Sequence, residues 1–135
     1  NDRIIFMNKH FTIKAPPSYP IVLIKAKETY KLWHDSLVNI KRIDRYTIGN
    51  RVDDIFLLFL ENTFRASFAY DKFEKLSFVS KTVTGCDLLR FLLQIVWEQK
   101  IIDTKTYGAI ILNLEEVGRM LGGWKKNIEE KTPPR

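Results

Sequence analysis

The sequence Glu115-Glu116-Val117-Gly118-Arg119-Met120-Leu121-Gly122-Gly123-Trp124 decides the fold, because it combines a helical pattern with three glycines and a tryptophan. Each glycine inside a helix costs about 1 kcal/mol relative to alanine. Gly118 and Gly122 are four residues apart and therefore share one helix face. Such a pair lets a neighbouring helix pack close to the backbone. The sequence leaves open whether that neighbour belongs to the same chain or to another subunit of an oligomer.

Helical periodicity continues from this stretch over most of the chain, with apolar residues recurring at three- and four-residue steps or small multiples. We expect four helices, at residues 21–40, 47–70, 72–101 and 104–128. Thr47 and Thr104 are good N-cap residues for the second and fourth helices, and residues 41–46 are expected to form a turn. Four helices with short connections predict an all-α, up-and-down four-helix bundle.

The chain divides into three parts. Prolines at positions 16, 17 and 20 forbid a regular helix near the amino terminus, so residues 1–20 are expected to form an extended arm. No strand pair and no internal repeat are evident in the sequence. Residues 21–130 are expected to make up the four-helix bundle, and residues 131–135 a flexible tail.

The second predicted helix is apolar on almost every side. Its expected core stripe comprises Val52, Ile55, Phe56, Phe59, Thr63 and Ala66. Leu57, Leu58, Leu60 and Phe64 are apolar as well. A helix of a four-helix bundle should keep one face in water, so we predict that this helix also packs against another subunit. The residues predicted to pack within the bundle or the oligomer are Leu57, Phe64, Phe91, Gly118, Gly122 and Trp124.

Composition indicates one folded domain. The 135 residues are 45% hydrophobic and 28% charged, which is ordinary for a folded protein. The longest apolar run, residues 55–60, is much shorter than the roughly 20 residues of a membrane-spanning helix, so no membrane partner is expected. The apolar start lacks a small-residue cleavage site and a charged leader, so we expect no signal peptide. Cys86 has no second cysteine for an internal disulfide, which fits a cytoplasmic protein.

The sequence lacks side chains in the patterns that catalysis or metal binding requires. Its two histidines and one cysteine are not grouped with carboxylates at metal-ligand spacing, so no metal site is expected. His34-Asp35 and Asp53-Asp54 are the best acid–base candidates. Adjacent helical residues point about 100° apart, so neither pair converges on one substrate atom. We therefore expect solvent-exposed carboxylates at these positions, no catalytic residue, no cofactor and no enzymatic activity.

Basic residues indicate a polyanionic partner. Lys and Arg number 22 against 16 acidic residues, which gives a formal net charge of +6. Guanidinium groups suit phosphates, and tyrosine can stack on an exposed base. The predicted nucleic-acid-binding residues are Lys41, Arg42, Arg45, Tyr46, Arg51, Lys125 and Lys126. The alternative is that these side chains form an ordinary charged surface.

Arg90 stands out because it lies in an almost entirely apolar stretch, where Gln94 is the nearest polar residue on the same helix face. An arginine in such a place needs either a charged partner or an exit to solvent. It can be presented at a channel or protein-docking surface, which makes Arg90 and Gln94 candidate docking residues. It can instead form an ion pair between subunits, for which the possible acids are Glu98, Asp87 and Glu116. Arg119 poses the same choice, and there we favour the structural role.

The sequence resembles the accessory variability determinant (Avd) of diversity-generating retroelements. That family belongs to a group of small bacterial four-helix-bundle proteins, which also includes proteins encoded by intervening sequences in large-subunit ribosomal RNA genes. The resemblance covers about residues 25–128 and rests mainly on the motif around Trp124. Its other landmarks are Leu88-Leu89-Arg90-Phe91-Leu92-Leu93, Tyr30-Lys31-Leu32-Trp33 and Arg45-Tyr46-Thr47-Ile48-Gly49-Asn50-Arg51.

The resemblance implies a barrel-like homopentamer of four-helix bundles. Its retroelement members bind the element's reverse transcriptase and nucleic acid, and they are needed for adenine-mutagenic copying of template RNA. It therefore implies a non-catalytic accessory protein that binds reverse transcriptase and template RNA or cDNA, with DNA or an RNA/DNA hybrid left open as ligands. Arg90 matches an arginine of the family's third helix, whereas Gln94 departs from the basic residue expected there. The alternative is an oligomeric binding protein of the intervening-sequence type with an undefined partner.

Overall fold

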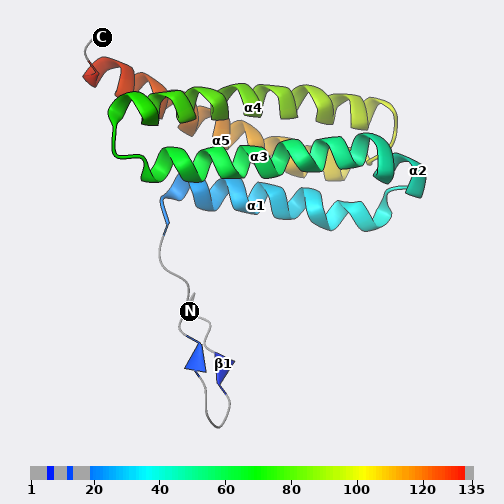
Figure 1. Ribbon diagram of the computed structural model, residues 1–135. Coiled ribbons are helices and arrows are strands. Elements are labelled where there is room, and N and C mark those ends of the chain that lie inside the picture. The colour runs from blue at the N-terminus through cyan, green and yellow to red at the C-terminus, as the bar shows by residue number, and fades with distance from the viewer. Residues whose placement is uncertain (1–5, 8–11, 14–18, 133–135) are drawn as a thin grey trace.

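A computed structural model describes residues 6–7, 12–13 and 19–132 of the chain. In this part of the chain, four long helices run in alternating directions (Figure 1). Three short helical segments join the first long helix to the second. In chain order the elements are β1 (Phe6–Met7), β2 (Thr12–Ile13), α1 (Ile21–Ser36), η1 (Leu37–Asn39), α2 (Arg42–Asp44), η2 (Arg45–Gly49), α3 (Asn50–Phe68), α4 (Lys72–Glu98) and α5 (Thr104–Lys131).

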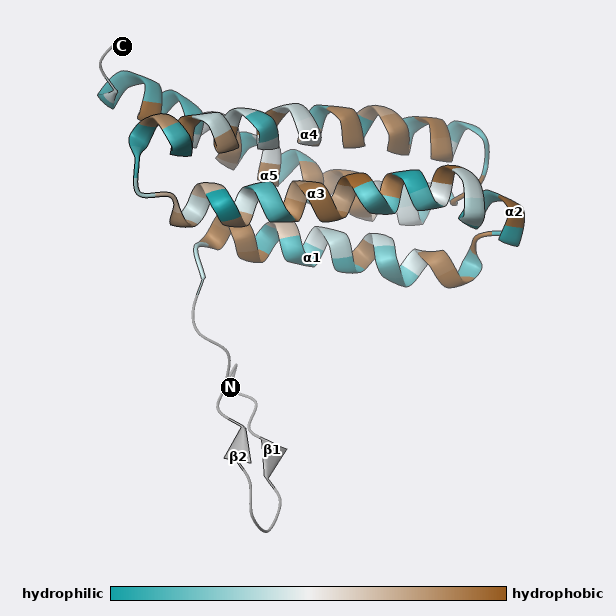
Figure 2. Ribbon diagram, viewed as in Figure 1, coloured by the Kyte–Doolittle hydropathy of each residue, from teal (hydrophilic) through white to brown (hydrophobic). Residues whose placement is uncertain are grey.

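The arrangement confirms the predicted four-helix bundle. Helix α1 packs against α3 and α5, and α4 packs against the same two helices. One large hydrophobic cluster is shared by the four long helices, and a smaller one, formed by Ala66, Val79 and Ile128, lies near the α3–α4 connection. Figure 2 shows that hydrophobic residues also run along α3 and the second half of α4. The bundle therefore positions two apolar helices side by side.

The core stripe predicted for the second helix is confirmed. The six residues of this stripe, Val52, Ile55, Phe56, Phe59, Thr63 and Ala66, are all buried. Trp33 of α1 is 0% exposed and stacks on Phe56, with the two ring centroids 6.1 Å apart. Full burial of one large apolar side chain stabilises a fold by about 1.5–3 kcal/mol. The contact between α1 and α3 therefore includes the largest fully buried side chain of the core.

Asp53 lies at this α1–α3 contact, and its carboxylate is already engaged. Its Oδ1 accepts a hydrogen bond from the Tyr30 hydroxyl at 2.9 Å and another from Trp33 Nε1 at 3.2 Å. Burial, together with the hydrogen bond to Asp53 and the charge of that carboxylate, raises the pKa of Tyr30 to about 12. The prediction of a solvent-exposed carboxylate is therefore wrong for Asp53, whereas Asp54 is exposed as expected.

The turn predicted at residues 41–46 is helical instead. The second helical region begins at Arg42, and residues 45–49 form a π-helix that continues directly into α3. Gly49 permits this tight turn, because a Cβ there would lie 3.0 Å from the carbonyl oxygen of Asp44. Thr47 is therefore inside a helix and not at its N-cap, and its hydroxyl donates to the carbonyl oxygen of Ile43 at 2.8 Å.

The ends of the later helices also differ in detail from the prediction. The N-cap of α5 is Asp103 and not Thr104, since the Asp103 carboxylate accepts a hydrogen bond from the Thr106 backbone N–H at 2.7 Å. Hydrogen bonds from the Thr106 side chain and backbone hold the pKa of Asp103 below its usual value. Helix α4 ends at Glu98 and not at Ile101, because the chain turns through a left-handed conformation at Lys100, with φ of 59°.

Near the amino terminus, the expectation that the chain has no strand pair is wrong. Strands β1 and β2 pair antiparallel, with Phe6 opposite Ile13 and Met7 opposite Thr12. Alternating apolar residues are too few in such short strands to give a detectable period. At the other end α5 continues to Lys131, and residues 133–135 of the predicted tail lie outside the described residues, as do residues 1–5, 8–11 and 14–18 of the predicted arm.

The two glycines that share a face of α5 have different surroundings. A Cβ on Gly118 would lie 3.4 Å from the Cys86 Sγ atom of α4, so α4 comes close at this point. No described atom outside the local helix would lie within 4 Å of a Cβ on Gly122. Helix packing within one chain therefore accounts for Gly118 but offers no account of Gly122.

We predict that Asp53→Ala lowers the free energy of unfolding by about 2 kcal/mol, because it leaves the buried Trp33 indole N–H without an acceptor. Asp53→Asn keeps an acceptor oxygen and should lose less. Urea denaturation at one protein concentration measures both. Asp54→Ala is the matched control, with an expected change within about 0.5 kcal/mol. Equal small losses for Asp53→Ala and Asp54→Ala would contradict the assigned role of Asp53.

We also predict that Gly122→Ala raises the free energy of unfolding by about 1 kcal/mol, because alanine favours the helix and its Cβ points into open space within the chain. Gly108→Ala serves as control, since its Cβ would likewise meet no atom within 4 Å. Urea denaturation and light scattering should be measured together. A loss of stability or of mass with Gly122→Ala alone would show that a second molecule approaches this position.

Candidate nucleic-acid interface

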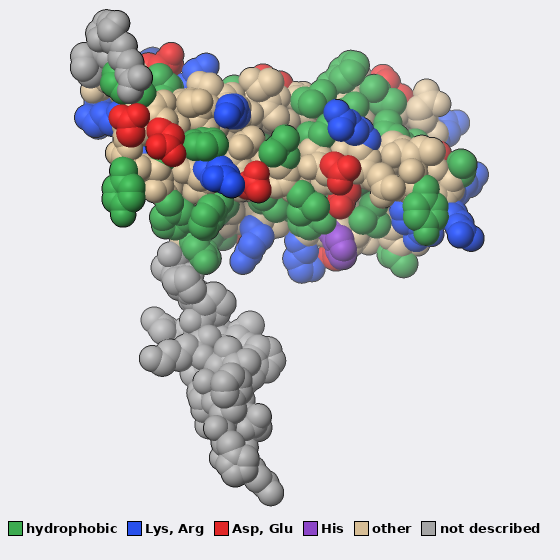
Figure 3. All heavy atoms as spheres, in the orientation of Figure 1, with side chains coloured by type: hydrophobic (Ala, Val, Ile, Leu, Met, Phe, Trp, Pro, Cys, Tyr) green, Lys and Arg blue, Asp and Glu red, His purple; other side chains and the backbone are tan. Residues whose placement is uncertain are grey.

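The end of the bundle where α1 connects to α3 carries a group of basic residues. Lys41, Arg42, Arg45 and Tyr46, here called the basic turn, lie on or next to α2 and η2. Lys and Arg side chains gather at this end of the molecule in Figure 3. Because the segment is helical, Arg42 and Tyr46 share one face, and the Arg42 guanidinium carbon lies 5.6 Å from the Tyr46 ring centroid. The structure thus brings together the four basic-turn residues that the sequence predicted.

Tyr46 is 61% exposed, and its ring is available on the side away from the guanidinium. An arginine held over an aromatic ring adds a cation–π contact of about 0.5–1 kcal/mol at an exposed site. The same pair presents one flat surface and one positive charge. A nucleotide carries one flat base and one negative phosphate, so the pair has the chemistry of a single-nucleotide platform.

The cations of the basic turn are not neutralised by neighbouring acids. Among the described residues, no ion pair within 4.0 Å is formed by Lys41, Arg42 or Arg45. Other basic side chains are paired, for example Lys31 with Asp35 at 2.8 Å and Arg65 with Glu61 at 3.9 Å. Unpaired guanidinium groups keep their donors free for phosphate oxygens.

Two exposed apolar residues flank the basic turn and were missed in the sequence. Val38 is 77% exposed and Ile43 is 69% exposed. Ile43 gave little signal in the sequence, because it lies in the predicted turn, which has no defined face, whereas Val38 lies near the end of the first predicted helix. Their positions make this end of the bundle both basic and apolar.

Arg51 belongs to a neighbouring surface. It lies in the first turn of α3 at one end of a groove between α3 and α4, the α3–α4 groove. Leu58 and Leu88 form part of the groove's apolar floor, and Lys81 of α4 adds a second cation that the sequence analysis did not single out. Asp54 also lines the α3–α4 groove, so its two cations share the groove with one carboxylate.

Lys125 and Lys126 lie near the opposite end of the bundle. They are about 30 Å along α5 from its first residue, which is beside the basic turn's end of the molecule. Trp124 is half-buried between the two core clusters, and Lys75 of α4 lies 5.5 Å from its ring centroid. One chain therefore does not bring these two lysines together with the basic turn.

Arg90 lies in a surface groove between α4 and α5, the α4–α5 groove. Its Nε atom is 3.0 Å from a Glu115 carboxylate oxygen, and its Nη1 atom is 3.3 Å from an Asp87 carboxylate oxygen. Asp87 was among the acids predicted to pair with Arg90. The prediction placed that ion pair between subunits, whereas both ion pairs of Arg90 lie within one chain. Glu115 was missed, and Glu116 instead pairs with Lys25 of α1 at 3.7 Å. Arg90 is thus held in a fixed direction while 43% of its side chain stays exposed.

The neighbours of Arg90 suit contact with a protein better than contact with phosphate. Gln94 donates a hydrogen bond to Glu98 at 3.3 Å, so acidic groups flank both docking candidates. Phe91 beside them is 60% exposed. Leu57 and Phe64, two other residues predicted to pack in an oligomer, are 46% and 48% exposed in the single chain. Arg119 is exposed on α5 and forms no ion pair within 4.0 Å among the described residues.

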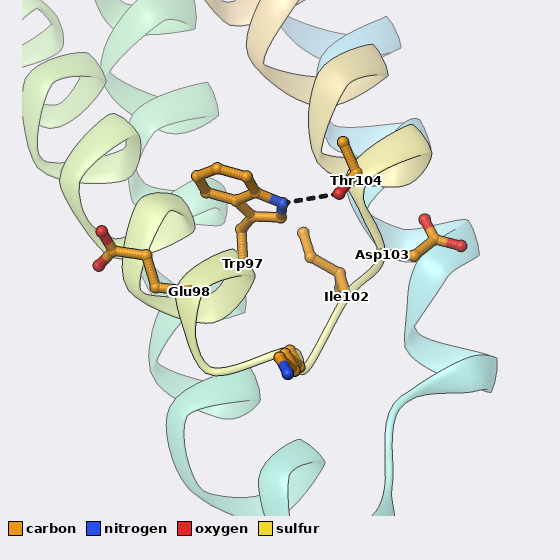
Figure 4. Close-up of a pocket in the computed structure, with 6 residues that line it drawn as sticks. Trp97, Glu98, Ile102, Asp103 and Thr104 are labelled. Carbon is orange, nitrogen blue, oxygen red and sulfur yellow. Dashed lines mark hydrogen bonds between the residues drawn. The ribbon is translucent and has the colours of Figure 1, made fainter.

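A further depression lies at the α4–α5 connection, where Trp97 donates a hydrogen bond from its indole nitrogen to the Thr104 hydroxyl at 3.1 Å (Figure 4). The Trp97 ring also stacks on Tyr107, with centroids 4.7 Å apart. Two carboxylates line this depression, those of Glu98 and Asp103. They point to opposite sides in Figure 4 and do not converge. This arrangement stabilises the connection and offers no pair for acid–base chemistry.

The described residues contain no group of three or more His, Cys, Asp or Glu side chains that could hold a metal ion. Cys86 is buried, and this burial raises the pKa of its thiol to about 12, so the thiolate is not available near neutral pH. The surfaces of this part of the molecule therefore have the features of binding surfaces, namely unpaired cations, exposed aromatic rings and apolar grooves.

A comparison with known families matches the sequence model of the bAvd-like family to residues 21–128. The chain belongs to the bAvd-like family. The match spans the whole bundle from the start of α1 to near the end of α5, and it confirms the resemblance to Avd-type proteins. The bAvd-like family consists of accessory, non-catalytic proteins. No curated protein matches the chain. In the described part of this bAvd-like chain, every helix is too short or too polar to cross a membrane.

Proposed function

We propose that this bAvd-like chain is a non-catalytic accessory protein of a diversity-generating retroelement. It binds the element's reverse transcriptase and the template RNA or its cDNA, and it supports mutagenic reverse transcription. Membership of the bAvd-like family carries this proposal. The unpaired cations of the basic turn support the nucleic-acid part of it.

The basic turn contacts the nucleic acid. Phosphates approach Arg42 and Arg45, and an unstacked base lies on the open face of Tyr46. Arg51 and Lys81 extend the path into the α3–α4 groove, whose apolar floor suits a base better than a phosphate. This binding is led by the nucleic-acid backbone and by stacking, so it is salt-sensitive and largely independent of sequence.

The chain acts as a homopentamer in this proposal. Half-exposed apolar side chains on α3, such as Leu57 and Phe64, support burial against other copies. A ring repeats the basic turn once per subunit, so weak contacts with one RNA add up through effective concentration. The same ring holds the polymerase close to its template.

The α4–α5 groove is the surface we assign to the reverse transcriptase. Asp87 and Glu115 hold the Arg90 guanidinium at the groove wall, so little conformational entropy is lost when a partner carboxylate or carbonyl accepts its remaining N–H groups. Phe91 and Tyr107 supply apolar contact area in the same groove. Exposed aromatic residues beside an arginine are typical of protein–protein contacts.

We predict that Arg42→Glu with Arg45→Glu weakens single-stranded RNA binding at least tenfold and lowers the slope of log affinity against log salt by about 1.4, or about 0.7 for each lost phosphate contact. Fluorescence anisotropy at several salt concentrations measures both quantities. Lys31→Glu with Arg65→Glu changes the net charge equally but alters paired cations. Equal losses in the two double variants would mean that net charge, and not the basic turn, binds RNA.

Stacking is tested separately at Tyr46. Tyr46→Ala should weaken RNA binding by about 1–3 kcal/mol with little change in salt slope, because it removes one stacking surface and no charge. Tyr46→Phe keeps the ring and should bind nearly as the unchanged chain does. Identical affinities for all three proteins would exclude the platform.

We predict that the chain co-purifies with the reverse transcriptase encoded nearest to it, with several copies of the chain for each polymerase by light scattering. Arg90→Glu should reduce the amount of polymerase recovered at least tenfold, because it places a third carboxylate beside Asp87 and Glu115. Gln94→Glu changes one charge at a neighbouring site and tests whether the effect is specific. A bare oligomer with soluble, folded but unbound polymerase would favour the intervening-sequence type of binding protein.

A further inference from the structure

A pocket lies beside the basic turn, between η1 and the connection of α4 to α5. This end pocket is lined by, among others, Asn39, Ile40, Lys100, Ile101, Ile102 and Asp103. Ile40 and Ile102 are buried in the core, so the apolar floor of the end pocket is fixed by the packing of the bundle. Its volume is about 280 Å³. Pockets for drug-sized ligands begin at about 300 Å³, so this one suits a group the size of a single nucleobase.

Two opposite charges line the end pocket without pairing with each other. These two described residues, Lys100 and Asp103, form no ion pair within 4.0 Å. In Figure 4 the Asp103 carboxylate points away from Trp97 and toward the cyan ribbon, the side on which Asn39 and Ile40 complete the pocket. Thr106 donates to this carboxylate and holds its pKa below the usual value, so near neutral pH Asp103 is an acceptor and not a donor.

The backbone at Lys100 gives its side chain a separate interest. Lys100 is the only residue other than glycine with a positive φ, 59°, in the described part of the chain. Its N–H donates to the Trp97 carbonyl oxygen at 2.9 Å, and the Ile101 N–H donates to that of Val96 at 2.9 Å. This is a common way to end a helix, and glycine is the preferred residue at the left-handed position. Side chains kept in such a strained conformation cluster at ligand-binding sites, so the lysine is a candidate ligand contact.

Opposite charges above an apolar floor match the Watson–Crick edge of guanine. Its N1–H and N2 amino groups are adjacent donors, which can donate to the two oxygens of one carboxylate. Each carboxylate oxygen has two lone pairs, so Asp103 can accept them in addition to the Thr106 N–H. The neighbouring O6 of guanine accepts from an ammonium or an amide, which Lys100 and Asn39 carry. Guanine is the only common RNA base that places two adjacent N–H donors beside a carbonyl oxygen.

The end pocket adjoins the basic turn. Ile40 of the pocket directly precedes Lys41 of the basic turn, and both follow η1. A strand whose phosphates lie on the basic turn therefore has a neighbouring base close to the end pocket. Specific recognition of RNA commonly reads the edges of such unstacked bases in single strands.

We propose that the end pocket binds one unstacked guanine of the RNA strand that the basic turn holds. Asp103 accepts from guanine N1–H and N2–H, while Lys100 and Asn39 donate to O6. This inference rests on the proposed binding of nucleic acid at the basic turn. It adds one base-specific contact to binding that is otherwise led by the backbone.

Fluorescence anisotropy with single-stranded RNAs of equal length and charge tests the proposal with the full chain. The probes are oligouridine and the same strand with its central uridine replaced by guanosine or by adenosine. We expect the guanosine strand to bind about tenfold more tightly than both others, the usual order for one bidentate base contact. An equal gain with adenosine would mean that purine stacking, and not the guanine edge, is recognised, and would overturn the proposal.

The oligouridine strand separates this inference from the proposed function. Equal binding of all three strands would overturn the guanine site and leave nucleic-acid binding by the basic turn in place. Failure of every strand to bind would overturn both. Free guanosine monophosphate at the RNA concentration should not displace the guanosine strand, because it lacks the neighbouring phosphates. Displacement would assign the end pocket to a free nucleotide and overturn the choice of RNA.

Asp103→Asn tests the carboxylate while keeping a good N-cap for α5. It should abolish the preference for guanosine, even though the more positive net charge favours RNA in general. Asp71→Asn is the matched control, because it makes the same change at the N-cap of α4, outside the end pocket, and should leave the preference intact. A preference retained by Asp103→Asn would overturn the assigned contact with the guanine edge.

Lys100→Gly distinguishes ligand binding from a structural role. Glycine adopts the left-handed conformation without strain, so the midpoint of urea unfolding should rise. The preference for guanosine should fall at the same time, because the donor to O6 is lost. A loss of preference in a more stable protein cannot result from misfolding. An unchanged preference would overturn the role of Lys100 in the end pocket.

Discussion

The carboxylate of Asp53 joins α1 to α3, and the placement of the basic turn between these two helices depends on this contact. Two donors from α1, the Tyr30 hydroxyl and the Trp33 indole N–H, converge on one oxygen of Asp53. Without that acceptor, the largest fully buried side chain of the core would carry an unsatisfied polar group. With it, Trp33 stacks on Phe56 and sets the separation of the two helices. The basic turn connects these two helices, so its position follows from the way they pack.

Charge pairing distinguishes Arg90 and the cations of α1 from the cations of the basic turn. Arg90, Lys25 and Lys31 each have a carboxylate partner within 4.0 Å, which fixes their direction and lowers their attraction for phosphate. The basic turn keeps its cations unpaired within the described part of the chain and places one of them over an exposed tyrosine ring. The unpaired cations and the exposed ring support the proposal that this end of the bundle binds nucleic acid.

Much of the fold could be predicted from periodicity, because a buried helix face leaves a clear mark every three or four residues. The core stripe of α3 and the four long helices follow from that pattern. The segment at residues 41–49 could not be predicted, because the absence of a Cβ at Gly49 and the return of the Thr47 hydroxyl to the backbone are matters of local geometry. The sequence showed that the basic turn contains cations and a tyrosine. It did not predict the helical conformation that places Arg42 over the Tyr46 ring.

By itself, the sequence determined the number and order of the long helices, the burial of Trp33 and Phe56, and the family resemblance. These properties depend on residue type and spacing, which the one-dimensional pattern preserves. Only the tertiary structure decided that Asp53 is an internal acceptor, that Arg90 pairs with Glu115, and that Lys125 and Lys126 lie far from the basic turn. Those facts depend on which helix faces meet, because residues distant in sequence become partners only when the helices are packed in three dimensions.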